Sequence, residues 1–587
     1  MRAFLAKPLR NHRHVLLIVP LFAIMMTWPT FPRIFDGDEF WLHSSHRDEW
    51  YGFWDAWHLE RVLTGQADYY FTDSLFHPEG ASLAMHSMSL PHALLMAVLQ
   101  KAMPADDAYK LLFLLMLCFN GFCSYLLIQQ LIEDKWLALF GALVAVAATP
   151  FPHDSTPRDL MAWGTIPLSL YFLQRSIFEG RGRFAALAGM CAGITAFMSM
   201  YILVMNLMTV GIYSSFLALK AWRKRPFWRT LTVFCAVCCL FSFLRVYPMA
   251  AGSSLLEYRR QEKAERVRSV DVMMYFVHAG NPFTGDLIQE LLQVPPGYNW
   301  RDGYIGYINV FFIACALLFC RRRGRLTPWI TILLLFAVLR LGAYLTINGV
   351  KYKHIALPEA FLSEWLPYPF GFVNIQEYYS IGIALPLAIV STFGLAALLR
   401  SKPTVIRIAL VLLASAILAF EFYAPREGRG VVPEKTAYID WLRSNAPSEI
   451  QLIHLPRHLP QYYLYLQTLG DYPHVLGKTG NVPLSAEVHV QSNLLLDAWW
   501  SRRRNIHCLH YNRQEYIAAV DRILESGSTY IIVHTWRWGA EFLMPSFGNI
   551  PAAYEDDFVS VYKLRDLRQS CENMRTINST APPPPRI

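Results

Sequence analysis

Carboxylates, histidines and tryptophans are concentrated in residues 36–80, immediately after the first long apolar run of the chain. Three of the carboxylates, Asp36, Asp38 and Glu39, come within a few residues of the end of that run. If the run crosses a membrane, these side chains stay close to its surface. A carboxylate there could deprotonate an acceptor hydroxyl while a lipid-anchored donor stays in the bilayer. The alternative is solvated interfacial charge, and we favour an active-site loop.

Aromatic side chains surround a further carboxylate in the same loop. Asp55 lies among Trp50, Trp54 and Trp57. Tryptophans at this density indicate either a belt at the membrane interface or a platform on which a sugar ring stacks. The second interpretation predicts that Trp54 and Asp55 contact a substrate.

The string TDSLFHPEG (72–80) adds a third group of polar side chains. It contains Asp73, His77 and Glu79, its Pro-Glu-Gly end predicts a turn, and His86 follows shortly after. We predict that these side chains bind substrate. The loop's histidines and carboxylates could also ligate Zn²⁺ or Mn²⁺, but no HExxH-like spacing appears, so no metal ligand is assigned.

Basic residues that could hold a phosphate lie in two later segments. Arg259, Arg260 and Arg266 belong to YRRQEKAERVRS (258–269), and guanidinium groups bind phosphate well. The other interpretation of this segment is a helix with intrahelical ion pairs, because glutamates are interspersed. His153 and Arg158, in FPHDSTPRDL (151–160), could face the same cavity as these phosphate-binding arginines.

Long apolar runs must position these residues. The chain has 587 residues, of which 54% are hydrophobic, and repeated runs of bilayer length are typical of a polytopic helical membrane protein. Residues 87–103 are apolar but short, which favours a surface or re-entrant helix. We expect eleven spans, at about 15–35, 109–131, 136–150, 160–178, 184–200, 202–220, 229–250, 304–320, 327–347, 376–399 and 403–423.

The charge pattern supports this count. With a cytoplasmic N-terminus, the short inward loops hold twenty Lys and Arg residues, as the positive-inside rule requires. The outward side then receives the loops 36–108, 251–303 and 348–375, and loop 36–108 has twelve acidic residues against three basic ones. Because the basic residues cluster between apolar runs, the net charge of +9 reflects topology, and we expect no nucleic-acid partner.

The composition changes after the last run. Residues 1–425 form the predicted membrane domain, and 426–571 read as a soluble extracytoplasmic α/β domain with a helix at 436–445 and strands at 450–456, 530–536 and 558–564. The tail 572–587 is predicted to be disordered. Cys508 and Cys571 could pair if this domain is extracytoplasmic. The other eight cysteines lie in or beside apolar runs, as buried hydrophobes do.

Several strings resemble a known group of proteins. FDGDEF (35–40), FWDAWHLERVLTGQADYYFTDSLFHPEGASLAMH (53–86), RSVDVMMYFVHAGNPF (268–283), RDGYIGYINV (301–310) and YLQTLGDYPHVLGKTGNVP (465–483) resemble bacterial membrane proteins loosely grouped with the GT-C glycosyltransferases. The resemblance implies a polyprenyl-phosphate sugar donor, inversion at the anomeric carbon, and Asp38 as the base, with Asp36 or Glu39 as alternates. Gln376 and Glu377 stand where the group often has an arginine, and DGDE spreads the usual acidic pair over four residues.

The sequence therefore predicts a multi-pass glycosyltransferase of the bacterial inner membrane. It would move a sugar from a polyprenyl-linked donor to an extracytoplasmic cell-envelope glycan or lipid. A divalent cation, Mg²⁺ or Mn²⁺, is a possible cofactor. The alternatives are a transporter or flippase of lipid-linked glycans, which would need ionisable residues within its spans, and a non-enzymatic envelope assembly factor.

Overall fold

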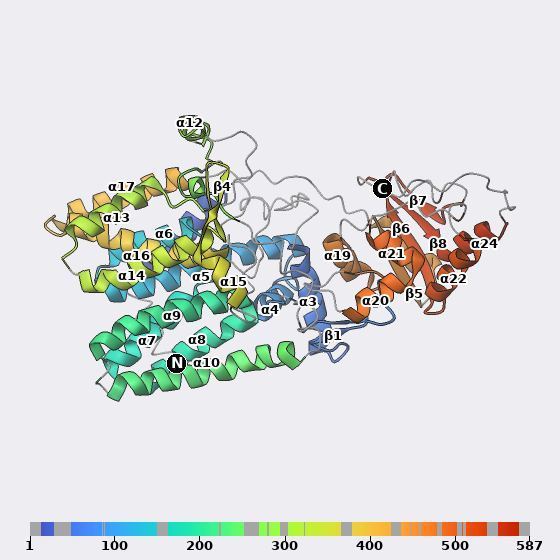
Figure 1. Ribbon diagram of the computed structural model, residues 1–587, viewed down its shortest axis with the longest axis horizontal. Coiled ribbons are helices and arrows are strands. Elements are labelled where there is room, and N and C mark those ends of the chain that lie inside the picture. The colour runs from blue at the N-terminus through green and yellow to red at the C-terminus, as the bar shows by residue number, and fades with distance from the viewer. Residues whose placement is uncertain are drawn as a thin grey trace. The chain divides into compact units, whose positions relative to one another are not determined.

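The computed structural model shows a chain made of two units (Figure 1). The membrane unit comprises Met1–His43 and Ser87–Val431, and the soluble unit comprises Ser44–His86 and Val432–Ile587. The structure describes residues 13–28, 49–84, 86, 88–149, 162–221, 223, 225–251, 269–278, 281–283, 285–293, 303–321, 323–365, 378–423, 436–447, 449–456, 460–477, 484–501, 508, 512–536, 540, 547 and 550–573.

A helix lies in each of the eleven apolar runs that were expected to span the membrane, although the run expected at 327–347 is helical only to Arg340 and ends in strand β3 (Tyr344–Ile347). These helices are α2 (Arg13–Met26), α5 (Ala105–Ile132), α6 (Lys135–Ala147), α7 (Thr165–Glu179), α8 (Gly182–Met198), α9 (Met200–Ala221), α10 (Arg225–Ala251), α13 (Tyr307–Phe319), α14 (Arg323–Arg340), α16 (Tyr379–Leu399) and α17 (Thr404–Phe422). Among the described residues, five of them (α5, α9, α10, α16 and α17) are long and apolar enough to cross a bilayer. The expected class of α-helical polytopic membrane protein is confirmed.

Helix α16 is the centre of the membrane unit. It is apolar on all sides and buried along almost its whole length, and it packs against α13, α14 and α6 (Figure 1). Gly394 makes the close approach to α13 possible, because a Cβ at this position would overlap the backbone carbonyl of Phe312. In contrast, α10 and α17 expose large apolar side chains such as Leu240, Phe243 and Leu412, as expected of helices that face lipid.

Helix α4 (Leu90–Leu99) lies in the apolar stretch for which a surface or re-entrant helix was predicted. Its ten residues extend about 15 Å, roughly half of the hydrocarbon thickness. This helix is therefore too short to cross a bilayer alone, as the sequence indicated.

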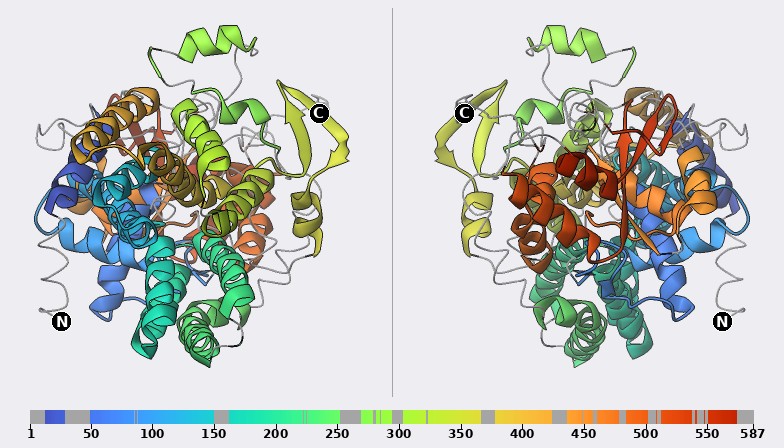
Figure 2. Two further views of the ribbon diagram at one scale, coloured as in Figure 1. Left: turned by 90° about the vertical axis from the view of Figure 1, so that its left-hand side faces the viewer. Right: turned by 90° about the vertical axis from the view of Figure 1, so that its right-hand side faces the viewer.

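The loops of the membrane unit carry short elements: η3 (Val272–Tyr275), α12 (Gly285–Leu291), β3 (Tyr344–Ile347), β4 (Val350–Ala356) and α15 (Pro358–Trp365). Strands β3 and β4 form an antiparallel hairpin, shown in yellow at the periphery of the unit in Figure 2. The Asp271 carboxylate holds its turn, because it accepts hydrogen bonds from the amides of Asn348 (3.0 Å) and Gly349 (2.6 Å) while capping η3.

The soluble unit is an α/β domain built on a four-stranded sheet of order β5-β6-β8-β7. Strands β5 (Ile450–Leu455) and β6 (Ser528–His534) are parallel, whereas β8 (Val559–Lys563) runs antiparallel to both β6 and β7 (Tyr554–Glu555). The C-terminal part of this unit, Val432–Ile587, also contains the helices α18 (Ala437–Asn445), α19 (Pro460–Gly470), α20 (Leu484–Ser492), α21 (Leu494–Ser501), α22 (Arg513–Leu524) and α24 (Leu564–Asn573). The remaining elements are α3 (Glu49–Leu63), β1 (Phe71–Thr72) and β2 (Ala81–Ser82).

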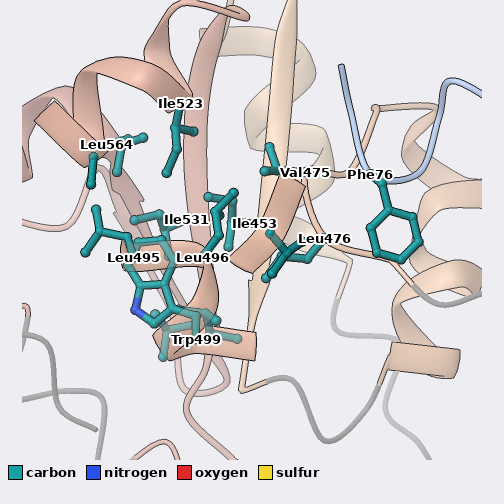
Figure 3. Packing of buried hydrophobic residues seen from close by; sticks show 14 of the residues in the cluster. Phe76, Ile453, Val475, Leu476, Leu495, Leu496, Trp499, Ile523, Ile531 and Leu564 are labelled. Carbon is teal, nitrogen blue, oxygen red and sulfur yellow. The ribbon is translucent and has the colours of Figure 1, made fainter. Parts of the chain in front are cut away.

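Side chains alternate between the two faces of this sheet. Ile453 and Ile531 lie in a core that includes Leu495 and Trp499 of α21 and Leu564 of α24 (Figure 3). All six residues of β5 are buried, which is typical of a strand covered on both faces. The predicted pairing of Cys508 with Cys571 is confirmed as a disulfide with a Cα–Cα distance of 5.8 Å.

Candidate functional site

The backbone of residues 74–77 extends the C-terminal sheet through residues 473–475. His474 forms bridges to Leu452 of β5 on one side and to Leu75 on the other. The His474 amide donates to the Ser74 carbonyl (2.9 Å), and the His77 amide donates to the His474 carbonyl (3.0 Å). The string TDSLFHPEG thus supplies an outer ladder at the β5 edge, which satisfies backbone groups that an open edge would leave unpaired.

Gln467 of α19 fastens the same loop from the side. Its amide oxygen accepts a hydrogen bond from the Trp54 indole Nε1 (2.7 Å), and its Nε2 donates to the carbonyls of Ser74 (2.6 Å) and Tyr472 (3.0 Å). Helix α3 packs against α19 along this contact. A single buried amide therefore connects α3, the TDSLFHPEG string and the C-terminal part of the unit.

Two of the three tryptophans of α3, Trp50 and Trp54, are buried within the soluble unit. Trp54 has no exposed surface and belongs to the same apolar cluster as Ile453 and Trp499, and Trp50 packs on the rings of Tyr462 and Tyr465. This packing role differs from both interpretations of the sequence, a belt at the membrane interface and a platform for a sugar ring. The contact of Trp54 with substrate stays a prediction.

Asp55 and His86 form a buried pair next to Trp54. The His86 Nε2 lies 2.9 Å from Asp55 Oδ1, and both side chains are 1% exposed. Because the pair has no open surface, it joins α3 to the segment after β2, and its predicted contact with substrate also stays a prediction. His58 stacks on Trp54 with ring centroids 4.8 Å apart, and burial lowers the pKa of His58 despite its hydrogen bond to the Asp68 carbonyl.

Asp73, His77 and Glu79 lie on the turn that was predicted for TDSLFHPEG. The amide of Gly80 donates to the Phe76 carbonyl (3.0 Å), and Gly80 has a φ of +72°. A Cβ at residue 80 would overlap the Phe71 ring, so this turn requires glycine on both counts. Asp73 and Glu79 are exposed, and His77 is half-buried.

A pocket of about 460 Å³ opens beside this turn, within the soluble unit. His77, Pro78 and Glu79 line it from the loop. The C-terminal part contributes the polar side chains His489, Ser492, Asn493, Arg522, Glu525 and Ser526. Val475, Leu496 and Ile523 supply an apolar side and belong to the core drawn in Figure 3. Two of the predicted substrate-binding residues, His77 and Glu79, are thereby brought together, whereas Asp73 does not line the pocket.

The pocket lining has more carboxylates than guanidinium groups, and several of its other side chains can form hydrogen bonds. Burial lowers the pKa of His489, and the nearby Glu79 carboxylate opposes the shift only in part. Arg522 donates to the carbonyls of Ala518 and Ser492, each at 3.3 Å, which fixes the guanidinium at the rim. Among the lining residues, the carboxylates of Glu79 and Glu525 face the single guanidinium of Arg522.

Three buried histidines lie on the other face of the sheet. The Nδ1 of His454 is 3.1 Å from the Nε2 of His534, and the rings of His454 and His474 have centroids 4.6 Å apart. Burial lowers the pKa of His454 far below its ordinary value and that of His474 to about 3. Neither this cluster nor any other group of His, Cys, Asp or Glu in the described ranges has the geometry of a metal site.

One carboxylic acid of the membrane unit is also perturbed. Glu359 of α15 is 3% exposed, and it accepts a hydrogen bond from the Tyr379 hydroxyl (3.2 Å). Burial raises the pKa of Glu359 to about 7, which outweighs the opposing effect of that hydrogen bond. Glu359 was not predicted from the sequence, because a lone glutamate in LPEAF carries no spacing signal.

Other predicted site residues lie outside the described residues: Asp36, Asp38, Glu39, His153, Arg158, Arg259, Arg260 and Arg266. Their roles stay predictions. Four residues described above were not predicted as site residues: Gln467, His474, His489 and Arg522. A signal for the first two existed, because both belong to the string YLQTLGDYPHVLGKTGNVP that carried the resemblance.

The chain was compared with protein families, curated proteins and solved structures. The model of the family described as "Domain of unknown function (DUF6311)" matches residues 17–368. No curated protein matches the sequence.

Solved structures match at low identity. The oligosaccharyltransferase of Archaeoglobus fulgidus, in complex with Zn and sulfate, is 13% identical with a TM-score of 0.50, over 91% of this chain and 70% of that one. The arabinofuranosyltransferase AftD from Mycobacteria is 14% identical with a TM-score of 0.54, over 94% of this chain and 41% of AftD. ArnT from Cupriavidus metallidurans, bound to undecaprenyl phosphate, is 12% identical with a TM-score of 0.49, over 95% and 98% of the two chains. The first two likenesses show that this chain shares the fold of these two proteins.

Proposed function

The chain belongs to the family described as a domain of unknown function, DUF6311, and we propose that it is a GT-C membrane glycosyltransferase. It moves a sugar from a polyprenyl-phosphate donor to an extracytoplasmic cell-envelope glycan or lipid. The observation that carries the proposal is the fold, which more than nine tenths of the chain shares with an oligosaccharyltransferase and an arabinofuranosyltransferase. Both of those proteins are glycosyltransferases by name. The resemblance of the strings at 35–40 and 53–86, in the first outward loop, points to the same class.

The proposed reaction starts at the acidic end of the first apolar run. Asp38 deprotonates the acceptor hydroxyl, with Asp36 or Glu39 as the alternate base, and the oxygen attacks the anomeric carbon in line. The bond from that carbon to the lipid phosphate oxygen breaks, so the sugar is transferred with inversion and polyprenyl phosphate leaves. Arg259, Arg260 and Arg266, or Arg158, neutralise the departing phosphate.

A divalent cation is part of the proposal only as an option. Carboxylate oxygens are the ligands that Mg²⁺ prefers and that Mn²⁺ also accepts, and Asp36, Asp38 and Glu39 supply them at the proposed active site. These three residues would then divide between binding a cation and accepting the proton.

We also propose that the soluble unit is extracytoplasmic. The disulfide between Cys508 and Cys571 supports this location, because structural disulfides persist in oxidising compartments and are rare in the cytosol. The predicted topology, with a cytoplasmic N-terminus and eleven spans, leads to the same side of the membrane.

Mass spectrometry of envelope glycans and polyprenyl-linked sugars in a strain lacking the gene tests the proposal. We expect one sugar to disappear from the glycans and its lipid-linked precursor to accumulate. The wild-type gene should restore the sugar, and Asp38→Asn should not. The matched control is Asp68→Asn, which removes an exposed carboxylate of the same loop. Full restoration by Asp38→Asn would exclude Asp38 as the base and favour transport of lipid-linked glycans.

A further inference from the structure

The pocket beside the TDSLFHPEG turn has the size and the lining of a ligand site. Its volume of about 460 Å³ falls in the lower part of the range of roughly 300–1,000 Å³ that small-molecule sites occupy. Its lining is mixed in character, because Val475, Leu496 and Ile523 are apolar whereas most of the other lining residues are polar or charged. A ligand for this pocket therefore combines apolar with polar groups.

The polar rim combines acceptors with donors. The carboxylates of Glu79 and Glu525 only accept hydrogen bonds when ionised, whereas Arg522 donates and the imidazole of His489 can do either. A ligand group that matches both kinds must itself donate and accept. Hydroxyl groups do so, and several of them around a ring that presents C–H groups on one face describe a pyranose.

The charge of the rim narrows the ligand class further. Two carboxylates against one guanidinium leave an excess of negative charge, and burial keeps His489 from offsetting it. Anionic groups such as a uronate or a phosphate meet repulsion there, whereas hydroxyls and ammonium groups do not. The polyprenyl phosphate of the donor is thus a poor ligand for this pocket.

We infer that this pocket binds an uncharged or amine-bearing sugar ring of the acceptor glycan. The identification of the sugar as part of the acceptor rests on the proposed function, whereas the binding of the sugar does not. The turn of the first loop and helices α20 to α22 form the pocket together, so the string TDSLFHPEG supplies part of the binding surface.

Saturation-transfer NMR on the full chain in lipid nanodiscs tests the inference without turnover. The probes are glucose, N-acetylglucosamine, glucosamine and glucuronate. We expect saturation transfer to the ring protons of the first three and binding of glucuronate that is about tenfold weaker. Failure of all three to bind, or binding of glucuronate at least as tight as that of glucose, would overturn the inference.

Two variants separate recognition from folding. Glu79→Gln combined with Glu525→Gln removes both carboxylates of the pocket and keeps Arg522. Glucosamine binding should then weaken about tenfold, and the discrimination against glucuronate should vanish. Glu515→Gln removes an exposed carboxylate from α22 outside the pocket and should change neither affinity. Unchanged sugar selectivity in the double variant would contradict the assignment.

Glycan transfer by the same preparations distinguishes the two proposals. A chain that binds sugars but transfers none contradicts the proposed function alone. A chain that transfers a sugar but shows no saturation transfer contradicts the pocket alone.

Discussion

Replacing Gln467 with alanine should release the first loop from the edge of the C-terminal sheet. The Gln467 side chain is 1% exposed and makes three hydrogen bonds, to Trp54, Ser74 and Tyr472. The Ser74 carbonyl keeps a second donor in the His474 amide, so its loss is partial. The Trp54 Nε1 loses the acceptor that the structure gives it and stays buried, which costs about 1–3 kcal/mol. With the lost Tyr472 bond and the space left by the side chain, we expect about 2–4 kcal/mol.

Hydrogen–deuterium exchange of the full chain in nanodiscs measures this loss where it occurs. Peptides that cover residues 71–86 should exchange roughly 30- to 700-fold faster in the variant, because each 1.4 kcal/mol is a factor of ten in the opening equilibrium. The matched control is Gln491→Ala, which removes an exposed glutamine whose amide pairs with Glu487 on the same helix. Its effect should stay within about 0.5 kcal/mol.

A double-mutant cycle identifies the responsible hydrogen bond. Trp54→Phe removes the donor and Gln467→Leu removes the acceptor, so the double variant leaves neither half of this hydrogen bond buried alone. The Tyr472 carbonyl loses its Gln467 donor in the single Gln467 variant and in the double variant alike, so that loss cancels in the cycle. The combined cost should fall short of the sum of the single costs by about 1–2 kcal/mol. Wild-type exchange rates over residues 71–86 in Gln467→Ala, or strict additivity in the cycle, would refute the role of this amide.

Two further predictions concern the stability of the soluble unit. Burial holds the pKa of His474 at about 3 in the folded unit against 6.5 for an ordinary histidine, so the unfolded chain binds the proton more readily. Stability is therefore full above pH 6.5 and falls as the pH decreases, by about 2.7 kcal/mol at pH 4.5, in pulse proteolysis; a flat profile between pH 7 and 4.5 would contradict this. Cys508→Ser opens the disulfide to Cys571, which closes a loop across a sequence separation of 63, and should cost about 4 kcal/mol. Reductant should destabilise the wild type by the same amount and leave Cys508→Ser unchanged. Equal thermal midpoints of the oxidised wild type and Cys508→Ser would refute this prediction.

The helices of the apolar runs and three strands of the C-terminal sheet were predictable because their signals are local. An apolar run of bilayer length has few alternatives to a helix, and the short clusters of Arg and Lys mark the predicted cytoplasmic ends of the runs. The strands expected at 450–456, 530–536 and 558–564 correspond to Ile450–Leu455, Ser528–His534 and Val559–Lys563, because β-branched and aromatic residues dominate those runs.

The composition of the pocket was not predictable, because it depends on pairing between segments about 400 residues apart. Both TDSLFHPEG and YLQTLGDYPHVLGKTGNVP stood out in the sequence, but nothing in either indicates that Leu75 pairs with His474. The tryptophans of α3 were ambiguous for a related reason. A tryptophan can bury its ring in lipid, on a sugar or in a protein core, and only the partners of Trp50 and Trp54 decide between these.

The shared core of the soluble unit decides how its function can be tested. Leu75 and Phe76 are fully buried in the same cluster as Ile453 and Val475. Deleting residues 426–587 would therefore expose apolar residues of the loop and leave the Ser74 and His77 backbone without partners. Loss of transfer in such a deletion would not show that the C-terminal part does chemistry, because the loop that follows Asp38 would lose its fold as well. The match to the family model ends at residue 368, yet it includes this loop. Buried residues of the loop nevertheless contact residues beyond 432. A substitution at Glu79 changes the pocket and one at Gln467 changes what holds the loop, so single substitutions separate substrate binding from folding where a deletion cannot.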